Sequence, residues 1–249
     1  MLLRRDFPHI AMLHSVSNRM DDSLKDWCIS HHRFSQLLDF LEEKQYETTH
    51  FGLLESKNYR PKASKKIILT FDDCPKNLLD FAVPELLKRK MKAAFYIPTA
   101  YIGGYNSWDV ENGKARLELM NEDDLKALSQ AGMEIGSHSH RHIALKTITY
   151  VPELEKEVRL SKQLLESITG QQVYSFSYPY GSVPIHYREI LSNAGYFYGL
   201  SIYQPFQTPL ALRRFGVYEK DTKEKIKRKL SLHYRWLRSV YDLTKNVKS

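Results

Sequence analysis

The chain alternates short apolar runs with longer segments in which apolar residues recur every three or four positions. The short runs are rich in β-branched and aromatic residues, which is typical of buried strands. We predict strands at residues 10–13, 67–71, 93–97, 133–136, 173–176, 197–202 and 212–217. The periodic segments predict helices at residues 32–45, 76–89, 121–130, 152–169 and 185–193, and a helical tail from residue 223 onward.

The order of these elements indicates the fold class. Strands that alternate with helices are typical of a parallel sheet with the helices outside it. In a chain of 249 residues, we expect an α/β fold whose sheet closes, or nearly closes, into a barrel. We expect the barrel to occupy residues 1–218 and residues 219–249 to form an additional C-terminal helix.

Composition narrows the class of protein. Hydrophobic residues make up 42% of the chain and charged residues 27%, as in ordinary globular domains. No apolar run approaches the roughly 18–20 residues that a membrane-spanning helix needs, and the start lacks the apolar segment of a secretory signal. The two cysteines, Cys28 and Cys74, fit a reducing compartment better than a disulfide scaffold. We therefore expect a cytoplasmic protein.

The excess positive charge is concentrated at one end. The formal net charge is +8, and residues 219–249 carry ten Lys or Arg against four Asp or Glu. In the same segment one apolar stripe recurs at helical spacing, formed by Ile226, Leu230, Tyr234, Leu237 and Tyr241. Such a basic amphipathic helix either packs on the barrel, lies on the anionic inner face of a membrane or meets a negatively charged substrate, and the sequence leaves these alternatives open. No nucleic-acid motif accompanies the charge, so we expect no nucleic-acid partner.

Residues capable of chemistry follow four of the predicted strands. His14 follows the first, Asp72 and Asp73 follow the second, and residues 137–142 and 177–181 follow two others. In a parallel barrel the carboxyl ends of all strands lie at one rim, where active sites are built. We therefore expect these side chains to meet at one place.

The densest of these groups contains three histidines in five positions. His138 and His142 are four residues apart, so a single turn or tight loop can put both on one side. Two imidazoles and one carboxylate make a three-ligand set with a position left for water, as in catalytic zinc-type sites. The second carboxylate can then act as a general base, which explains two adjacent aspartates at a strand end. His140 is interpreted as a spectator between the two ligands.

These residues resemble the metal-dependent polysaccharide deacetylases of the NodB-homology type, carbohydrate esterase family four. The family motif T-F-D-D-G is matched by residues 70–73, H-[ST]-x-x-H by residues 138–142, and R-x-P-Y-G by residues 177–181 except at the arginine. The resemblance covers roughly residues 8–217. It implies a distorted (β/α) barrel of about seven parallel strands with outer helices.

The resemblance also implies a role for each matched residue. Asp72 would be the general base, and Asp73, His138 and His142 would bind the metal, with Zn²⁺ favoured over Co²⁺, Ni²⁺ or Mn²⁺. Tyr180 would offer its backbone N–H to the oxyanion. The reaction would be removal of the acetyl group from an N-acetylated sugar in a polysaccharide or glycan precursor.

Two positions depart from the family pattern. Cys74 stands where glycine is usual, and is either a tolerated small residue or a soft ligand beside the metal. Ser177 replaces the arginine that orients the base, and Arg213 or Arg214 is a candidate to supply that charge from another strand.

The general acid has two candidates. His233 lies in a leucine-containing motif in the helical tail, whereas His14 ends a strand, as in the subgroup that deacetylates poly-N-acetylglucosamine. We favour His14. Trp108, in a polar loop, is a candidate to stack on a sugar ring or to anchor that loop. Two other functions stay open: hydrolysis of O-acetyl esters or non-sugar amides with the same metal, and a glycan-binding protein without catalysis.

Overall fold

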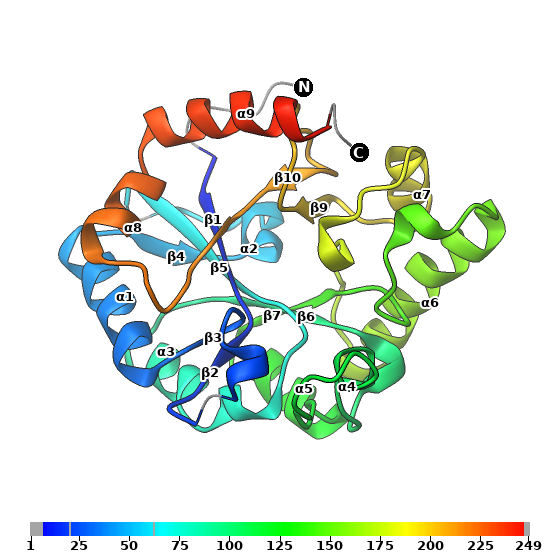
Figure 1. Ribbon diagram of the computed structural model, residues 1–249, viewed down its shortest axis with the longest axis horizontal. Coiled ribbons are helices and arrows are strands. Elements are labelled where there is room, and N and C mark those ends of the chain that lie inside the picture. Colours follow the sequence, from blue (N-terminus) through cyan, green and yellow to red (C-terminus); the bar gives the residue numbers. More distant parts are fainter. Residues whose placement is uncertain (1–6, 20, 62, 247–249) are drawn as a thin grey trace.

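Parallel strands form a barrel at the centre of the molecule (Figure 1). The computed structural model describes residues 7–19, 21–61 and 63–246. The main sheet runs in the order β10-β9-β8-β7-β6-β5-β1-β11, and every pairing in it is parallel. Its strands are β1 (His9–Leu13), β5 (Lys66–Phe71), β6 (Ala94–Ile97), β7 (Glu134–Ser137), β8 (Ser175–Ser177), β9 (Tyr198–Ser201), β10 (Leu212–Arg213) and β11 (Phe215–Gly216).

The barrel closes at one interrupted strand. β10 pairs with β9, and β11 pairs with β1, so the stretch 212–216 joins the two edges of the sheet. Arg214 is the single residue between the two halves, and its N–H donates to the carbonyl of Ser201 at 3.0 Å. The α/β barrel expected from the sequence is confirmed, with about seven strands when the interrupted one is counted once.

Three short strands were not predicted. β4 (Glu47–Thr49) pairs with residues 66–68 of β5. β6 pairs with residues 70–71 of β5 along the same edge. β2 (Ser15–Val16) and β3 (Cys28–Ile29) form a separate two-stranded sheet after β1. Strands of two or three residues are too short to produce a recognisable alternation of apolar and polar positions.

Helices surround the barrel (Figure 1). They are α1 (His31–Glu43), α2 (Phe51–Glu55), α3 (Ala82–Lys88), α4 (Ser107–Val110), α5 (Glu122–Gln130), α6 (Val151–Thr169), α7 (Tyr187–Asn193), α8 (Lys223–Lys229) and α9 (Leu232–Asn246). Short 3-10 turns lie at η1 (Asp22–Leu24), η2 (Lys76–Leu79), η3 (Thr99–Tyr101), η4 (Leu145–Thr147) and η5 (Pro179–Gly181).

Local chemistry explains where the helices begin. Asn121 and Asp124 form a reciprocal capping box at the start of α5, as the sequence indicates. The segment predicted as one helix at 76–89 is instead η2 followed by α3. Pro84 is the third residue of α3, where its missing N–H costs no intrahelical bond.

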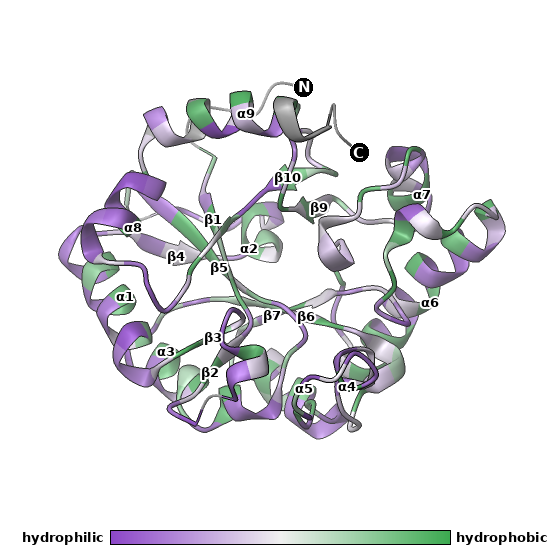
Figure 2. Cartoon of the chain, viewed as in Figure 1, coloured by the Kyte–Doolittle hydropathy of each residue, from purple (hydrophilic) through white to green (hydrophobic). Residues whose placement is uncertain are grey.

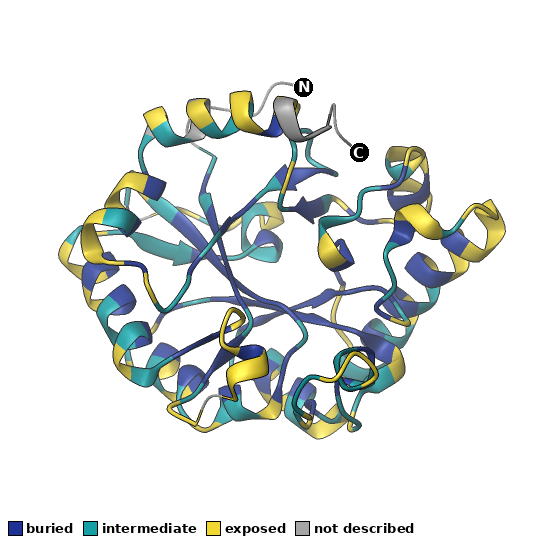
Figure 3. Cartoon of the chain, viewed as in Figure 1, coloured by how far each residue is buried: buried dark blue, intermediate teal, exposed yellow. Residues whose placement is uncertain are grey.

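The apolar core has two layers, one on each face of the sheet. Along β5, Ile67, Leu69 and Phe71 pack with the surrounding helices, whereas Ile68 packs inside the barrel. This alternation is what a strand with two buried faces requires. The strands are accordingly buried over most of their length, with half-buried residues mainly at their ends, while polar and exposed residues lie on the outer faces of the helices (Figures 2 and 3).

The C-terminal segment forms two helices that pack on the barrel, rather than one continuous helix. Ile226 and Leu230 are buried in the core, and Tyr234 is half-buried against it. Leu237 and Tyr241, the rest of the predicted apolar stripe, are each 46% exposed. Among the described residues, no helix combines the length and apolar character that crossing a membrane requires. The contact with an anionic membrane thus has no support from the structure and stays a prediction.

Candidate active site

The loops after β5, β7 and β8 have an unusual backbone. Of the seven non-glycine residues with positive φ in the described part of the chain, five lie in these loops: Asp73, Cys74, Ser139, His142 and Tyr180. Side chains other than glycine enter the left-handed region at an energetic cost, and such residues concentrate at functional sites. The tight turns bring polar side chains from three strand ends together at one rim of the barrel.

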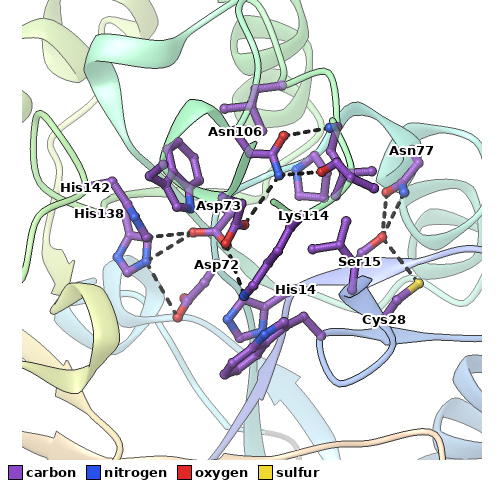
Figure 4. A pocket seen from close by; sticks show the side chains of 18 of the residues that line it. His14, Ser15, Cys28, Asp72, Asp73, Asn77, Asn106, Lys114, His138 and His142 are labelled. Carbon is purple, nitrogen blue, oxygen red and sulfur yellow. Dashed lines mark hydrogen bonds and ion pairs between the residues drawn. The ribbon is translucent and has the colours of Figure 1, made fainter. Parts of the chain in front are cut away.

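Asp73, His138 and His142 form a compact group with metal-ligand chemistry (Figure 4). Asp73 Oδ1 lies 3.0 Å from His142 Nε2 and 3.4 Å from His138 Nε2. One ligand atom from each residue lies within 4.8 Å of the others. Asp73 Oδ1 is buried and has no hydrogen-bond partner among the described residues. A carboxylate and two imidazoles converging on one point suit a divalent cation such as Zn²⁺.

Asp72 points to a different partner. Both of its oxygens accept hydrogen bonds from the Arg214 guanidinium, Oδ1 from Nη1 and Oδ2 from Nη2, each at 2.7 Å. The same guanidinium donates to Ser177 Oγ at 2.9 Å and to Thr70 Oγ1 at 3.1 Å. Asp72 Oδ2 lies 4.0 Å from His138 Nε2, so this carboxylate borders the ligand group without belonging to it.

Two arginines were candidates to replace the one missing at Ser177, and the structure distinguishes them. Arg214 contacts Asp72, and Ser177 supplies an acceptor for it. Arg213 turns to the other side, where it donates to Ser239 Oγ at 2.7 Å and pairs with Asp242 at 3.4 Å. Arg213 does not line the cavity at the site. The structure therefore places Arg214, and not Arg213, at the site, because adjacent residues near the strand break face opposite sides.

Burial and neighbouring charges set the protonation of the carboxylates. Burial alone would raise the pKa of Asp72, but Arg214 and His138 outweigh it and hold the pKa below its usual value. Burial opposes the ionised form of Asp73 as well, yet His142 and His138 lower its pKa well below the usual range. Both carboxylates are therefore ionised at neutral pH, as a ligand and a base require.

His14 enters the site from the end of β1, on the opposite side from His142 (Figure 4). Its ring packs on Trp27 with centroids 4.8 Å apart. Burial lowers the pKa of His14, although Asp73 and Asp72 act in the opposite direction. The other candidate for the general acid, His233, is exposed on α9 and does not line the cavity.

A cavity of about 360 Å³ contains these side chains. The cavity is lined by the predicted residues His14, Asp72, Asp73, His138, His142, Tyr180 and Arg214. It is also lined by residues that the sequence did not indicate, among them Trp27, Asn77, Asn106, Lys114 and Arg116. They come from loops, from η2 and from the segment before β3, where no periodic pattern or strand-end position marks a residue as part of a site.

Three further predicted residues have clear positions. Cys74 Sγ is buried and points to the carbonyl oxygens of Tyr96 at 3.3 Å and Phe71 at 3.6 Å, away from the ligand group. His140 Nδ1 is hydrogen-bonded to Thr99 Oγ1 at 2.9 Å and is not in the ligand group. Trp108 is only 8% exposed, stacks on His142 and lines the cavity, and its stacking on a sugar ring stays a prediction.

Known proteins resemble the chain in sequence. Residues 59–199, more than half of the chain, match the polysaccharide deacetylase family. YxkH of Bacillus subtilis (strain 168) is 26% identical over 77% of this chain and 63% of its own length. The poly-beta-1,6-N-acetyl-D-glucosamine N-deacetylase of Staphylococcus aureus (strain MSSA476) is 23% identical over 75% of this chain and 65% of its own length. The chain therefore spans slightly less than two thirds of these relatives.

Solved structures share the fold. The deacetylase PplD of Streptococcus pyogenes, in complex with acetate, aligns with a TM-score of 0.74 and 21% identity over 90% of this chain and 98% of its own. IcaB of Ammonifex degensii aligns with a TM-score of 0.72 and 17% identity over 90% of this chain and 97% of its own. On the match over residues 59–199, the chain belongs to the polysaccharide deacetylase family.

Proposed function

We propose that the protein is a metal-dependent deacetylase that removes the N-acetyl group from an N-acetylated sugar in a polysaccharide or glycan precursor. The observation that carries this proposal is the pair of adjacent aspartates with separate surroundings. Asp73 faces His138 and His142, whereas Asp72 faces Arg214. One carboxylate is thus available as a ligand and the other as a base.

Asp73, His138 and His142 would hold the cation. A divalent cation there supplies Lewis-acid activation of the acetyl oxygen and of the attacking water. Zn²⁺ suits two imidazoles and a carboxylate, and Co²⁺, Ni²⁺ and Mn²⁺ are the other candidates.

Asp72 would take the proton of the attacking water. Its Oδ2 accepts from Arg214 at 2.7 Å and lies 4.0 Å from His138 Nε2, so the carboxylate is held beside the ligand group. Arg214 fixes the carboxylate by two contacts at once, which limits its rotation. Ser177 completes this arrangement, because its Oγ accepts from Arg214 and donates to Asp72 Oδ2 at 3.3 Å.

His14 and Tyr180 would serve the rest of the reaction. His14, when protonated, would give its proton to the departing amine, which is otherwise a very poor leaving group; such assistance typically contributes about 10²–10⁴-fold. Tyr180 borders the cavity with a φ of 58°, and its ring lies edge-on to His142 at 4.9 Å. Its backbone N–H is the proposed donor to the oxyanion, a contribution typically of about 3 kcal/mol.

The chain resembles a poly-beta-1,6-N-acetyl-D-glucosamine N-deacetylase in sequence. This resemblance supports an N-acetylated glucosamine polymer as the substrate class. The contact of Arg214 with Asp72, where an arginine at position 177 is absent, supports a catalytic role over the glycan-binding alternative. Cytoplasmic location and the absence of a nucleic-acid partner stay predictions.

Acetate release from a panel of compounds tests the proposal. The metal-loaded protein is incubated with N-acetylglucosamine oligomers and with an O-acetylated sugar, and acetate and free amine are measured. We expect acetate and amine from the oligomers in equal amounts. Acetate from the ester alone would favour an O-deacetylase, and bound metal without acetate from either compound would favour a non-sugar amide. Neither metal nor acetate would favour a glycan-binding protein.

A further inference from the structure

The two histidines of the ligand group differ in how their second ring nitrogen is held. His138 Nδ1 is hydrogen-bonded to the carbonyl of Ser177 at 2.8 Å, which fixes the nitrogen that faces Asp73. Metal-binding histidines usually make such a bond with their second nitrogen. The Nδ1 of His142 is buried and has no hydrogen-bond partner among the described residues. Another contact must therefore hold the His142 ring.

Among the aromatic rings beside His142 in the described residues, Trp108 has the shortest centroid distance and is stacked, whereas His138 lies edge-on at 4.8 Å. The two rings are stacked, with centroids 4.2 Å apart and planes at 29°. Tyr180 also touches His142, but edge-on at 4.9 Å, and it is 58% exposed whereas Trp108 is 8% exposed. A buried flat face covers one side of the imidazole and restricts its rotation, whereas an exposed ring at its edge restricts it less.

Trp108 is itself held from outside the ligand loop. Tyr101 packs edge-on against it at 4.9 Å. The backbone carbonyl of Trp108 accepts a hydrogen bond from Asn112 Nδ2 at 2.7 Å. Asn106, which is buried, closes the same loop by bonds to the carbonyl of Ala115 and the N–H of Leu117. The indole is thus fixed by residues 101–117 and acts on His142 as an independent support.

We propose that Trp108 is a positioning residue for His142: stacking takes the place of the missing hydrogen bond and keeps Nε2 directed at Asp73 Oδ1. This inference rests on the proposed function, because it assumes that His142 binds a cation. It assigns Trp108 no contact with the reacting atoms.

Metal affinity tests this assignment without relying on activity. Zn²⁺ and Co²⁺ are titrated calorimetrically into the full chain after chelation, and the Co²⁺ absorption spectrum is recorded. Trp108→Leu should raise the Kd about 10–100-fold, the usual effect of removing a partner of a metal-binding histidine. Trp108→Phe keeps a ring face and should retain most of the affinity. Trp27→Leu is the matched control, since Trp27 packs on His14 rather than on a ligand, and its Kd should equal that of the wild type.

The outcomes separate the two claims. A wild-type Kd in a folded Trp108→Leu protein would overturn the positioning role while leaving the proposed function intact. Failure of the wild type to bind either metal would overturn both. Should Trp108→Leu not fold by circular dichroism, Tyr101→Leu takes its place, because it removes the ring that packs on the indole edge. An unchanged Kd in that variant would then overturn the positioning role.

Discussion

The guanidinium of Arg214 meets both carboxylate oxygens of Asp72 at 2.7 Å, across 142 residues of sequence. Asp72 follows β5, and Arg214 is the residue at which the barrel closes between β10 and β11. Both side chains are buried. Closure of the barrel and the ionisation of the proposed base therefore depend on the same contact.

Substitution of Arg214 should affect both stability and rate. Arg214→Met would leave a buried carboxylate unpaired, and we expect the free energy of unfolding to fall by about 3–5 kcal/mol. Arg214→Lys keeps the charge but loses the two-point contact, and the misplaced base should lower kcat about 10²-fold. Urea unfolding and acetate release measure the two effects.

A relocation experiment controls for damage unrelated to Asp72. The double variant Ser177→Arg/Arg214→Ser moves the arginine to the position that the family motif predicts. We expect it to recover part of the activity that Arg214→Ser alone loses. Full activity of Arg214→Ser would show that Asp72 does not need this partner.

His14 should determine the alkaline side of the pH profile. Burial holds the pKa of His14 below its ordinary value of 6.5, and a general acid must be protonated to act. kcat/KM of the wild type should therefore fall as the pH rises through that lowered pKa. His14→Gln should lower kcat by about 10²–10⁴-fold, keep the bound metal, and remove this alkaline limb. If the alkaline limb persists in His14→Gln, a group other than His14 causes it.

Cys74 occupies a backbone position that favours glycine. Its φ is 53° and its side chain is buried. Cys74→Ala keeps the strained backbone and loses the sulfur contacts, whereas Cys74→Gly relieves the strain. We expect Cys74→Gly to be more stable than Cys74→Ala by about 1 kcal/mol, measured by urea unfolding of the metal-free proteins. Both variants should bind one metal ion, and loss of the metal in both would indicate that the thiol is a ligand.

Asp221 joins the end of the barrel to α8. It is buried, pairs with Lys225 at 2.8 Å and with Lys229, and accepts from the N–H of Tyr218 at 2.9 Å. Burial would raise the pKa of Asp221, but the two lysines outweigh it and hold the pKa below 3.8. Its contribution to stability is therefore present above pH 3.8 and is lost as the pH falls through the folded-state pKa.

Asp221→Asn should lower the free energy of unfolding by about 3 kcal/mol at pH 7. The difference from the wild type should shrink as the pH is lowered toward 3, which urea titrations at several pH values would measure. Glu224→Gln, at an exposed position near the start of α8, is the matched control. A difference independent of pH would contradict the assigned role of the charge.

The sequence predicts the barrel and its inner site well for a physical reason. Buried strands leave unbroken apolar runs, and parallel strands bring their carboxyl ends to one rim, so the two aspartates, His138 and His142 could be grouped from position. The choice of Asp73 over Asp72 as the ligand came from the family resemblance. The choice between Arg213 and Arg214 could not be made, because a break of one residue in the closing strand decides which side chain faces inward.

The loop residues that line the cavity illustrate the same limit. Trp27 and Lys114 reach it from loops whose course depends on tertiary contacts, such as the bond from the N–H of Ala115 to Ser23 Oγ at 2.9 Å. Trp108 was recognised as a loop residue, but its stacking on His142 depends on the packing of two distant segments. Neither contact leaves a periodic signal in the sequence.

Metal content and acetate release, measured together on three proteins, test the central claim most directly. The wild type should contain one divalent ion per chain and release acetate from N-acetylglucosamine oligomers. Asp72→Asn should keep the ion and release no acetate, and His142→Ala should lose both. Loss of the ion from Asp72→Asn, or its full retention in His142→Ala, would contradict the division of roles between the base and the ligands.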